Sequence, residues 1–190
     1  MNAAAVERLF FALWPSAAER SAMAAVAARL ELDPRIRRIA AEEYHVTVAF
    51  VGEVAVARLE ALTEIGAASA RGPCTLQFDA YEYWPKPEVV VAAARQIPAS
   101  LERLWRVLHE RLGAIGCALD PKRLRPHVTL ARGVADAPDL PPPPACAWNV
   151  ADLCLVRSAR GRTTPAYTVL ARWPLLDEPA PAEKSTRTGD

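Results

Sequence analysis

Apolar residues along this chain come partly in short runs and partly at helical spacing, which predicts a mixture of strands and helices. Strands are predicted over residues 7–14, 36–40, 45–51, 74–83, 88–95, 127–132, 148–157 and 166–173. Helices are predicted over 16–30, 54–70 and 100–115, and a capping box of Ser16 and Glu19 opens the first of them. The order of these elements indicates an α+β fold.

The chain contains two similar halves, and a hexapeptide marks the same point in each. Residues 45–50 read His-Val-Thr-Val-Ala-Phe and residues 127–132 read His-Val-Thr-Leu-Ala-Arg, so four of the six positions are identical. Both hexapeptides lie on predicted strands, where side chains alternate between two faces. The histidine and the threonine of each hexapeptide are therefore expected on one face, and Phe50 is expected on the other.

A pseudo-two-fold packing of the halves would make His45 and His127 face each other across one cleft. In-line displacement at phosphorus needs a base on the attacking side and an acid on the leaving side. Histidine titrates near neutral pH and serves in either role, and the hydroxyls of Thr47 and Thr129 suit the non-bridging oxygens. The pattern predicts phosphoryl-transfer chemistry with no metal and no other cofactor. Two alternatives stay open here: a pair of buried structural histidines, and a zinc site whose third ligand the sequence does not supply.

The sequence resembles the 2H phosphoesterase superfamily and, within it, the bacterial family of RNA 2′,3′-cyclic phosphodiesterases, also called 2′-5′ RNA ligases or LigT-like proteins. The segments that carry the resemblance are residues 8–12, 45–53, 126–132, 167–170 and 173–175. The resemblance implies a bilobal, pseudo-two-fold α+β fold with two antiparallel sheets lining a central cleft and helices outside.

The resemblance also implies an activity, the hydrolysis of terminal 2′,3′-cyclic phosphates of RNA to 2′-phosphomonoesters. The reverse of that chemistry, with a 5′-hydroxyl in place of water, is 2′-5′ RNA ligation. By the same resemblance His45 would be the proton donor and His127 the proton acceptor. Thr47 and Thr129 would hold the phosphate. No metal takes part in this scheme.

Six further residues are candidates for binding the substrate. The cationic candidates are Arg125, Arg132 and Arg160. By strand alternation Arg132 is expected to point away from His127, and a structural ion pair is its alternative role. The aromatic candidates for stacking on a terminal base are Phe11, Tyr44 and Tyr167, with a place in the core as their alternative. His109 lies off the apolar stripe of its predicted helix and is interpreted as a solvated residue outside the site.

Composition narrows the class of protein. The chain is 52% hydrophobic and 24% charged, which is typical of a globular protein. The net charge of +1 excludes a strongly basic protein of the kind that coats nucleic acid. Residues 117–173 nevertheless carry eight basic and four acidic side chains. This local excess suits an RNA end or a small nucleotide as the partner. No apolar run approaches the roughly 20 residues of a membrane helix, and the absence of a signal-like start favours a cytoplasmic location.

One bilobal domain is expected over residues 1–176, followed by a disordered tail over 177–190, and a monomer is expected. Two other functions remain open. One is cyclic phosphodiester hydrolysis on small nucleotides such as ADP-ribose 1″,2″-cyclic phosphate, and the other is a non-catalytic module that binds nucleotides or RNA.

Overall fold

The structure is a computed structural model that describes residues 5–142, 145–159 and 166–177. The strands are β1 (Val6–Leu13), β2 (Arg37–Arg38), β3 (Val46–Ala55), β4 (Cys74–Phe78), β5 (Ala80–Trp84), β6 (Val89–Ala93), β7 (His127–Arg132), β8 (Cys146–Val150), β9 (Asp152–Ser158) and β10 (Tyr167–Pro174). The helices are α1 (Ala17–Ala27), α2 (Leu59–Ser69) and α3 (Ala99–Ala114), with single 3₁₀ turns at Ala41–Glu43 and Val56–Arg58. In these ranges no helix is long and apolar enough to cross a membrane. Apart from Asp177, the predicted tail lies outside the described residues.

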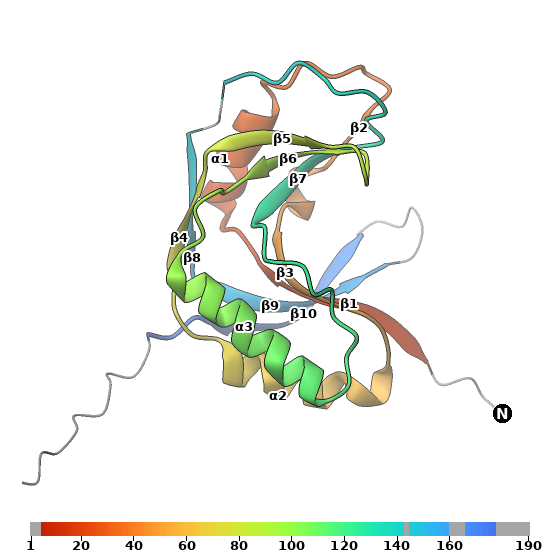
Figure 1. Ribbon diagram of the computed structural model, residues 1–190, viewed down its shortest axis with the longest axis vertical. Coiled ribbons are helices and arrows are strands. Elements are labelled where there is room, and N and C mark those ends of the chain that lie inside the picture. The colour runs from red at the N-terminus through yellow and green to blue at the C-terminus, as the bar shows by residue number, and fades with distance from the viewer. Residues whose placement is uncertain (1–4, 143–144, 160–165, 178–190) are drawn as a thin grey trace, which may run out of the picture.

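Two antiparallel sheets of four strands form the framework of the fold (Figure 1). The strand order is β10-β9-β1-β3 in the first sheet and β2-β7-β6-β5 in the second, while β4 pairs with β8 in a separate ribbon. This arrangement confirms the predicted α+β class with two antiparallel sheets. The halves of the chain also exchange strands, because β9 from the second half pairs with β1 and β2 from the first half pairs with β7. The single domain over 1–176 and the monomeric state stay predictions.

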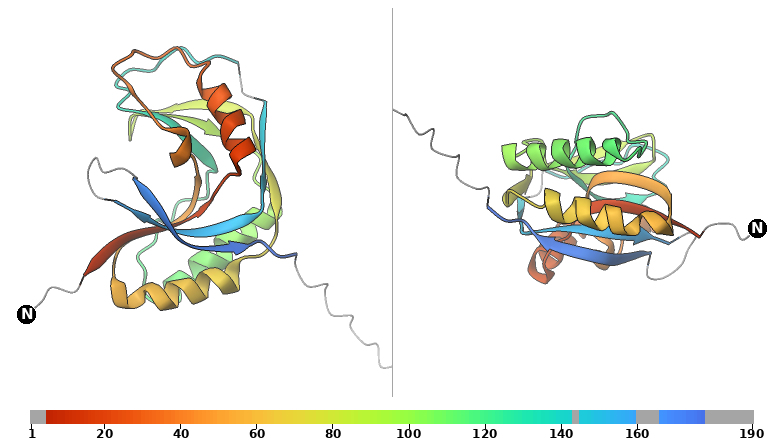
Figure 2. Two further views of the ribbon diagram at one scale, coloured as in Figure 1. Left: turned by 180° about the vertical axis from the view of Figure 1, so that it is seen from behind. Right: turned by 90° about the horizontal axis from the view of Figure 1, so that it is seen from below.

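The predicted repeat is present as two strand–helix–strand units, β1–α1–β3 and β6–α3–β7. In each unit the two strands pair as antiparallel neighbours, so the two hexapeptides occupy equivalent strands. The capping box of α1 is confirmed, since Ser16 Oγ accepts from the backbone N–H of Glu19 and the Glu19 carboxylate accepts from that of Ser16. Figures 1 and 2 show α1 at one end of the molecule and α2 with α3 at the other.

A β-bulge interrupts each hexapeptide at the same position. In β3, Phe11 pairs with Ala49 and Ala12 with Thr47, which leaves Val48 without a partner in β1. In β7 the register skips Leu130 in the same way, opposite Val90 and Val91 of β6. An extra residue reverses the alternation of faces beyond it. The residue that ends each hexapeptide therefore returns to the face of the histidine and the threonine.

Several predicted boundaries are wrong, and the cause in each case is pairing between distant segments. The predicted strand 74–83 is divided at Asp79, because β4 pairs with β8 whereas β5 joins the second sheet. The predicted strand 148–157 is divided at Ala151 for the same reason. The predicted helix 54–70 begins only at Leu59, because β3 continues along β1 as far as Ala55 and Gly52 takes a positive φ of 84° within it.

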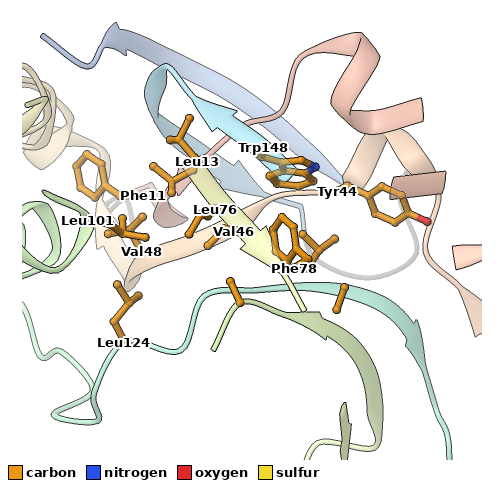
Figure 3. Packing of buried hydrophobic residues seen from close by; sticks show 14 of the residues in the cluster. Phe11, Leu13, Tyr44, Val46, Val48, Leu76, Phe78, Leu101, Leu124 and Trp148 are labelled. Carbon is orange, nitrogen blue, oxygen red and sulfur yellow. The ribbon is translucent and has the colours of Figure 1, made fainter. Parts of the chain in front are cut away.

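The core fills the space between the sheets, the ribbon and the helices (Figure 3). Its largest fully buried side chains include Trp148 and Phe78, whose rings meet edge to face with centroids 5.0 Å apart. Phe11 is fully buried and Tyr44 is 4% exposed, and both belong to this cluster. The prediction that Phe11 and Tyr44 stack on a terminal base is therefore wrong, because both rings are packed inside the core.

Alanine substitutions at two helical glycines, Gly66 and Gly113, test how tightly their helices are packed. In α2, a Cβ on Gly66 would overlap the indole ring of Trp173, whereas a Cβ on Gly113 in α3 meets nothing within 4 Å. We expect Gly66→Ala to lower the free energy of unfolding by about 1–3 kcal/mol through overpacking. Gly113→Ala should instead raise it by up to about 1 kcal/mol, because alanine favours helix. Urea unfolding of both variants checks the pair, and a Gly66→Ala protein as stable as the parent would contradict the packing.

Candidate active site

The two hexapeptides meet at adjoining pockets, where β3 and β7 contact each other. The first, which we call the His45 pocket, has a volume of about 270 Å³ and is lined in part by His45, Arg132 and Tyr167. The second, which we call the His127 pocket, has a volume of about 750 Å³ and contains His127 in its wall. Thr47 and Phe50 line both pockets, so the two pockets adjoin, and the charges of His127 and His45 affect each other. We call the two pockets together the cleft.

The same hydrogen bond orients both imidazoles. His45 Nδ1 lies 2.7 Å from the carbonyl oxygen of Glu43, and His127 Nδ1 lies 2.7 Å from that of Arg125. A carbonyl oxygen only accepts, so each Nδ1 carries a proton and donates it. In the neutral ring Nε2 is then an unprotonated acceptor. In each histidine the carbonyl two residues earlier fixes the orientation of the ring, and Nε2 is left free to accept or donate a proton.

His45 is embedded among aromatic rings. The Trp14 indole stacks on it at 5.5 Å between centroids and 5° between planes, and the rings of Phe10 and Tyr167 lie 5.0 and 4.9 Å away. Burial disfavours the charged imidazolium and lowers the pKa of His45 to about 4, against the opposing effect of the Glu43 carbonyl. In the free protein His45 is therefore neutral at neutral pH.

A smaller aromatic and ionic cluster surrounds His127. The Trp84 ring lies 4.5 Å from the imidazole, and the Arg125 guanidinium lies 4.3 Å from the Trp84 ring centroid on one of its faces. Glu82 accepts hydrogen bonds from Trp84 Nε1 and from Arg125, each over 2.8 Å. Burial lowers the pKa of His127 most, partly offset by its hydrogen bond to the Arg125 carbonyl, and the nearby Arg125 and Arg132 charges lower it further. Arg125 thus lies beside His127, and its binding of the substrate stays a prediction.

The bulges change which residues reach the cleft. The expectation that Arg132 faces away from His127 is wrong: Arg132 lines the His45 pocket, and its charge lowers the pKa of both histidines. Phe50 is expected on the buried face, yet 44% of it is exposed and it borders both pockets. Thr129 precedes its bulge and keeps the face of His127. No local feature of the sequence distinguishes a bulged strand from a regular one, so alternation alone misplaces both residues.

The structure also shows where the other predicted substrate-binding residues lie and which residues near the histidines were not predicted. Tyr167 lines the His45 pocket, and its stacking on a terminal base stays a prediction. Arg160 lies outside the described residues. Sequence reasoning missed Trp14, which ends a predicted strand, and Trp84, which directly follows one, although a proline comes next to each of them. It also treated His109 as solvated, whereas His109 is half-buried and lines the His127 pocket. Among the described residues no group of three or more His, Cys, Asp or Glu side chains is placed to hold a metal ion.

Comparison with known proteins gives one consistent family. Residues 14–162 match the model of the 2′-5′ RNA ligase superfamily. The chain is 35% identical over 143 residues to the RNA 2′,3′-cyclic phosphodiesterase of Escherichia coli (strain K12), which covers 73% of this chain and 80% of that protein. It is 29% identical over 181 residues to the RNA 2′,3′-cyclic phosphodiesterase of Thermus thermophilus, covering 90% of this chain and 91% of that protein. The crystal structure of E. coli LigT complexed with 3′-AMP matches with a TM-score of 0.82 at 31% identity, over 90% of this chain and 99% of that one.

Proposed function

The chain belongs to the 2′-5′ RNA ligase superfamily, and from that premise we propose that it hydrolyses terminal 2′,3′-cyclic phosphates of RNA to 2′-phosphomonoesters. Its homologues are RNA 2′,3′-cyclic phosphodiesterases, a class of phosphoric diester hydrolases. The observation that carries the proposal is the pair of imidazoles in one cleft, each held through Nδ1 by the carbonyl two residues before it. Two equivalent rings with free Nε2 atoms suit a reaction that needs both a base and an acid.

The two histidines, the two threonines and Arg132 each have a role in the proposed step. His127 Nε2 takes the proton of a water molecule as its oxygen attacks phosphorus, and protonated His45 gives its Nε2 proton to O3′ as the P–O3′ bond breaks. The hydroxyls of Thr47 and Thr129 donate to the non-bridging oxygens, where negative charge builds up. Arg132 adds a fixed positive charge beside them. Solvent then returns the proton from His127 to His45 between turnovers.

The negative charge of the bound substrate is needed to protonate His45. With a pKa of about 4, His45 lacks the proton it must donate until an anion enters the site. A bound phosphate anion within a few ångströms stabilises the imidazolium and raises this pKa. Phe50 and Tyr167 both line the His45 pocket, and in this proposal their rings stack on the terminal base. E. coli LigT binds 3′-AMP in its crystal structure, which agrees with a terminal nucleotide as the ligand.

A pH profile tests the assignment of two histidines to one step. The pair must carry one proton in total, so kcat/KM is highest between its two pKa values and falls on either side. Both values lie below the ordinary value of about 6.5. We expect a bell-shaped kcat/KM profile whose maximum lies on the acid side of about pH 6.5, and a kcat maximum at higher pH. Initial rates with adenosine 2′,3′-cyclic phosphate at constant ionic strength give both curves, and a profile with a single ionisation would contradict the pair.

The test of the function itself is a product analysis. The purified protein is incubated in EDTA with a short RNA that ends in a 2′,3′-cyclic phosphate, and the product is compared with 2′- and 3′-phosphate standards before and after phosphatase. Formation of the 2′-phosphate alone supports the proposal. A 3′-phosphate, or no turnover by a correctly folded protein, would overturn it.

A further inference from the structure

Glu82 lies on β5, two strands away from His127, and shares its face of the second sheet. The register places Glu82 opposite Val91 of β6, and Val91 opposite Thr129 of β7. Residues directly opposite each other on neighbouring strands point to the same face, so Glu82 lies in one row with Thr129, on the side of His127. Only 23% of the Glu82 side chain is exposed. A carboxylate in such a position needs partners that compensate for the loss of water.

The hydrogen-bond partners of this carboxylate are two side chains that lie at His127. Trp84 Nε1 and the Arg125 guanidinium each donate to the same oxygen, Glu82 Oε2, over 2.8 Å. The other oxygen, Oε1, lies 3.7 Å from Arg95 Nε. The Trp84 ring contacts the imidazole and the Arg125 guanidinium lies over that ring, so the three side chains form one cluster against His127. Glu82 itself lines neither pocket of the cleft.

The carbonyl that orients His127 lies outside regular secondary structure. It belongs to Arg125, in the stretch 117–126 that forms neither helix nor strand. The equivalent carbonyl in the other half belongs to Glu43, which ends the 3₁₀ turn Ala41–Glu43 and is held by the hydrogen bonds of that turn. Arg125 has no such turn, and its side chain is instead held by the ion pair with Glu82.

We propose that Glu82 is a positioning residue that holds His127 in the orientation of a base, acting through Trp84 and Arg125. This inference rests on the proposed function, in which His127 accepts the proton of water. Neighbouring strands lie about 4.8 Å apart, so β5 and β7, which β6 separates, are about 10 Å apart. Trp84 and Arg125 span this distance, one against the face of the imidazole and the other through the carbonyl at Nδ1.

The charge of Glu82 also opposes the positive charge beside the base. The charges of Arg125 and Arg132 lower the pKa of His127, that of Glu82 raises it, and His45 titrates in the adjoining pocket. Loss of the Glu82 charge leaves the Arg125 charge uncompensated and therefore lowers the pKa of His127 further. Loss of the Arg125 charge has the opposite sign and raises that pKa.

Two substitutions separate the hydrogen bonds of Glu82 from its charge. Glu82→Leu removes both, and we expect it to lower kcat for adenosine 2′,3′-cyclic phosphate by about 10–100-fold, since a misplacement of about 1 Å costs up to about 100-fold. Glu82→Gln keeps an acceptor oxygen at the same place and should recover most of this loss. KM should change little in either variant, because Glu82 does not line the cleft.

NMR titration of the imidazole Cε1 protons measures the pKa of His127 without any substrate. The chain contains three histidines, and the His127 signal is the one missing from His127→Gln. We expect Glu82→Gln to lower this pKa and Arg125→Gln to raise it. Asp152→Asn is the matched control and should change neither kcat nor the pKa. Asp152 also accepts from an arginine, Arg172, over 2.8 Å and is 27% exposed, but it lies in the first sheet and lines neither pocket.

The outcomes separate this inference from the proposed function. An unchanged kcat in a folded Glu82→Leu protein overturns the positioning role and leaves the hydrolase intact. A raised KM with unchanged kcat also overturns it, because Glu82 would then serve substrate binding. So do shifts of the His127 pKa in the same direction in Glu82→Gln and Arg125→Gln, which would reflect a general disturbance of the site. No hydrolysis by the parent protein overturns the proposed function, whereas opposite pKa shifts would still support the link between Glu82 and His127.

Discussion

Removing either imidazole is expected to lower kcat/KM for 2′,3′-cyclic phosphate hydrolysis by about 10²–10⁴-fold, the usual contribution of one general acid or base. His127→Ala leaves water without a base, and His45→Ala leaves O3′ without a proton donor. Initial rates with adenosine 2′,3′-cyclic phosphate measure both losses. Because the two rings act in the same step, the double variant should lose little more than the poorer single variant.

The controls for the histidine variants concern the fold and the shape of the pH profile. His45 packs against Trp14, Phe10 and Tyr167, so circular dichroism and the Tm must show that His45→Ala and the bulkier His45→Gln remain folded. Each single variant should also lose one limb of the bell-shaped pH profile. Hydrolysis within tenfold of the parent in a folded variant of either histidine would refute the acid–base pair.

The second large effect is expected at the threonines. Thr47→Val and Thr129→Val keep the shape of the side chain but remove the hydroxyl donor, and each should lower kcat by about 10²–10³-fold, as for other single donors to a transition-state anion. The loss should fall on kcat more than on KM, because charge on the non-bridging oxygens grows toward the transition state.

Two comparisons make the threonine test specific. Serine at either position restores a hydroxyl and should recover most of the activity. Thr63→Val is the matched control, since Thr63 is exposed on α2 and its hydroxyl only donates to the Leu59 carbonyl of the same helix. A Thr47→Val protein with the kcat of Thr63→Val would exclude a role for that hydroxyl.

The His45 pKa illustrates what local sequence leaves out. A His-x-Thr pattern on a strand predicts an imidazole beside a hydroxyl, but the pKa depends on what covers the ring. Phe10 lies on the first strand, Trp14 follows it and Tyr167 begins the last strand, and all three rings pack against the imidazole. Burial of the imidazole lowers its pKa to about 4. Burial of this kind is a sum over distant segments, so the sequence predicts the acid–base residue and not its state of ionisation.

The strands, too, divide into features that local sequence predicts and features that depend on distant segments. The hexapeptides, the helix with its capping box and the strand–helix–strand repeat were all predictable, because they depend on periodicity and on contacts within a few residues. The split of 74–83 into β4 and β5 was not, because it follows from pairing with β8, which lies about seventy residues further along the chain.

By itself the sequence determined the two His-x-Thr segments, the repeat that makes them equivalent and the class of chemistry that two such histidines perform. Only the tertiary structure decided which other side chains join them. Arg132 and Phe50 face the cleft because bulges, at Leu130 and Val48 respectively, reverse the alternation of faces in their strands. Phe11 and Tyr44 are buried in the core instead. The physical reason is that a bulge and a buried position are set by the neighbouring strand and by packing across the sheets, which no short stretch of sequence encodes.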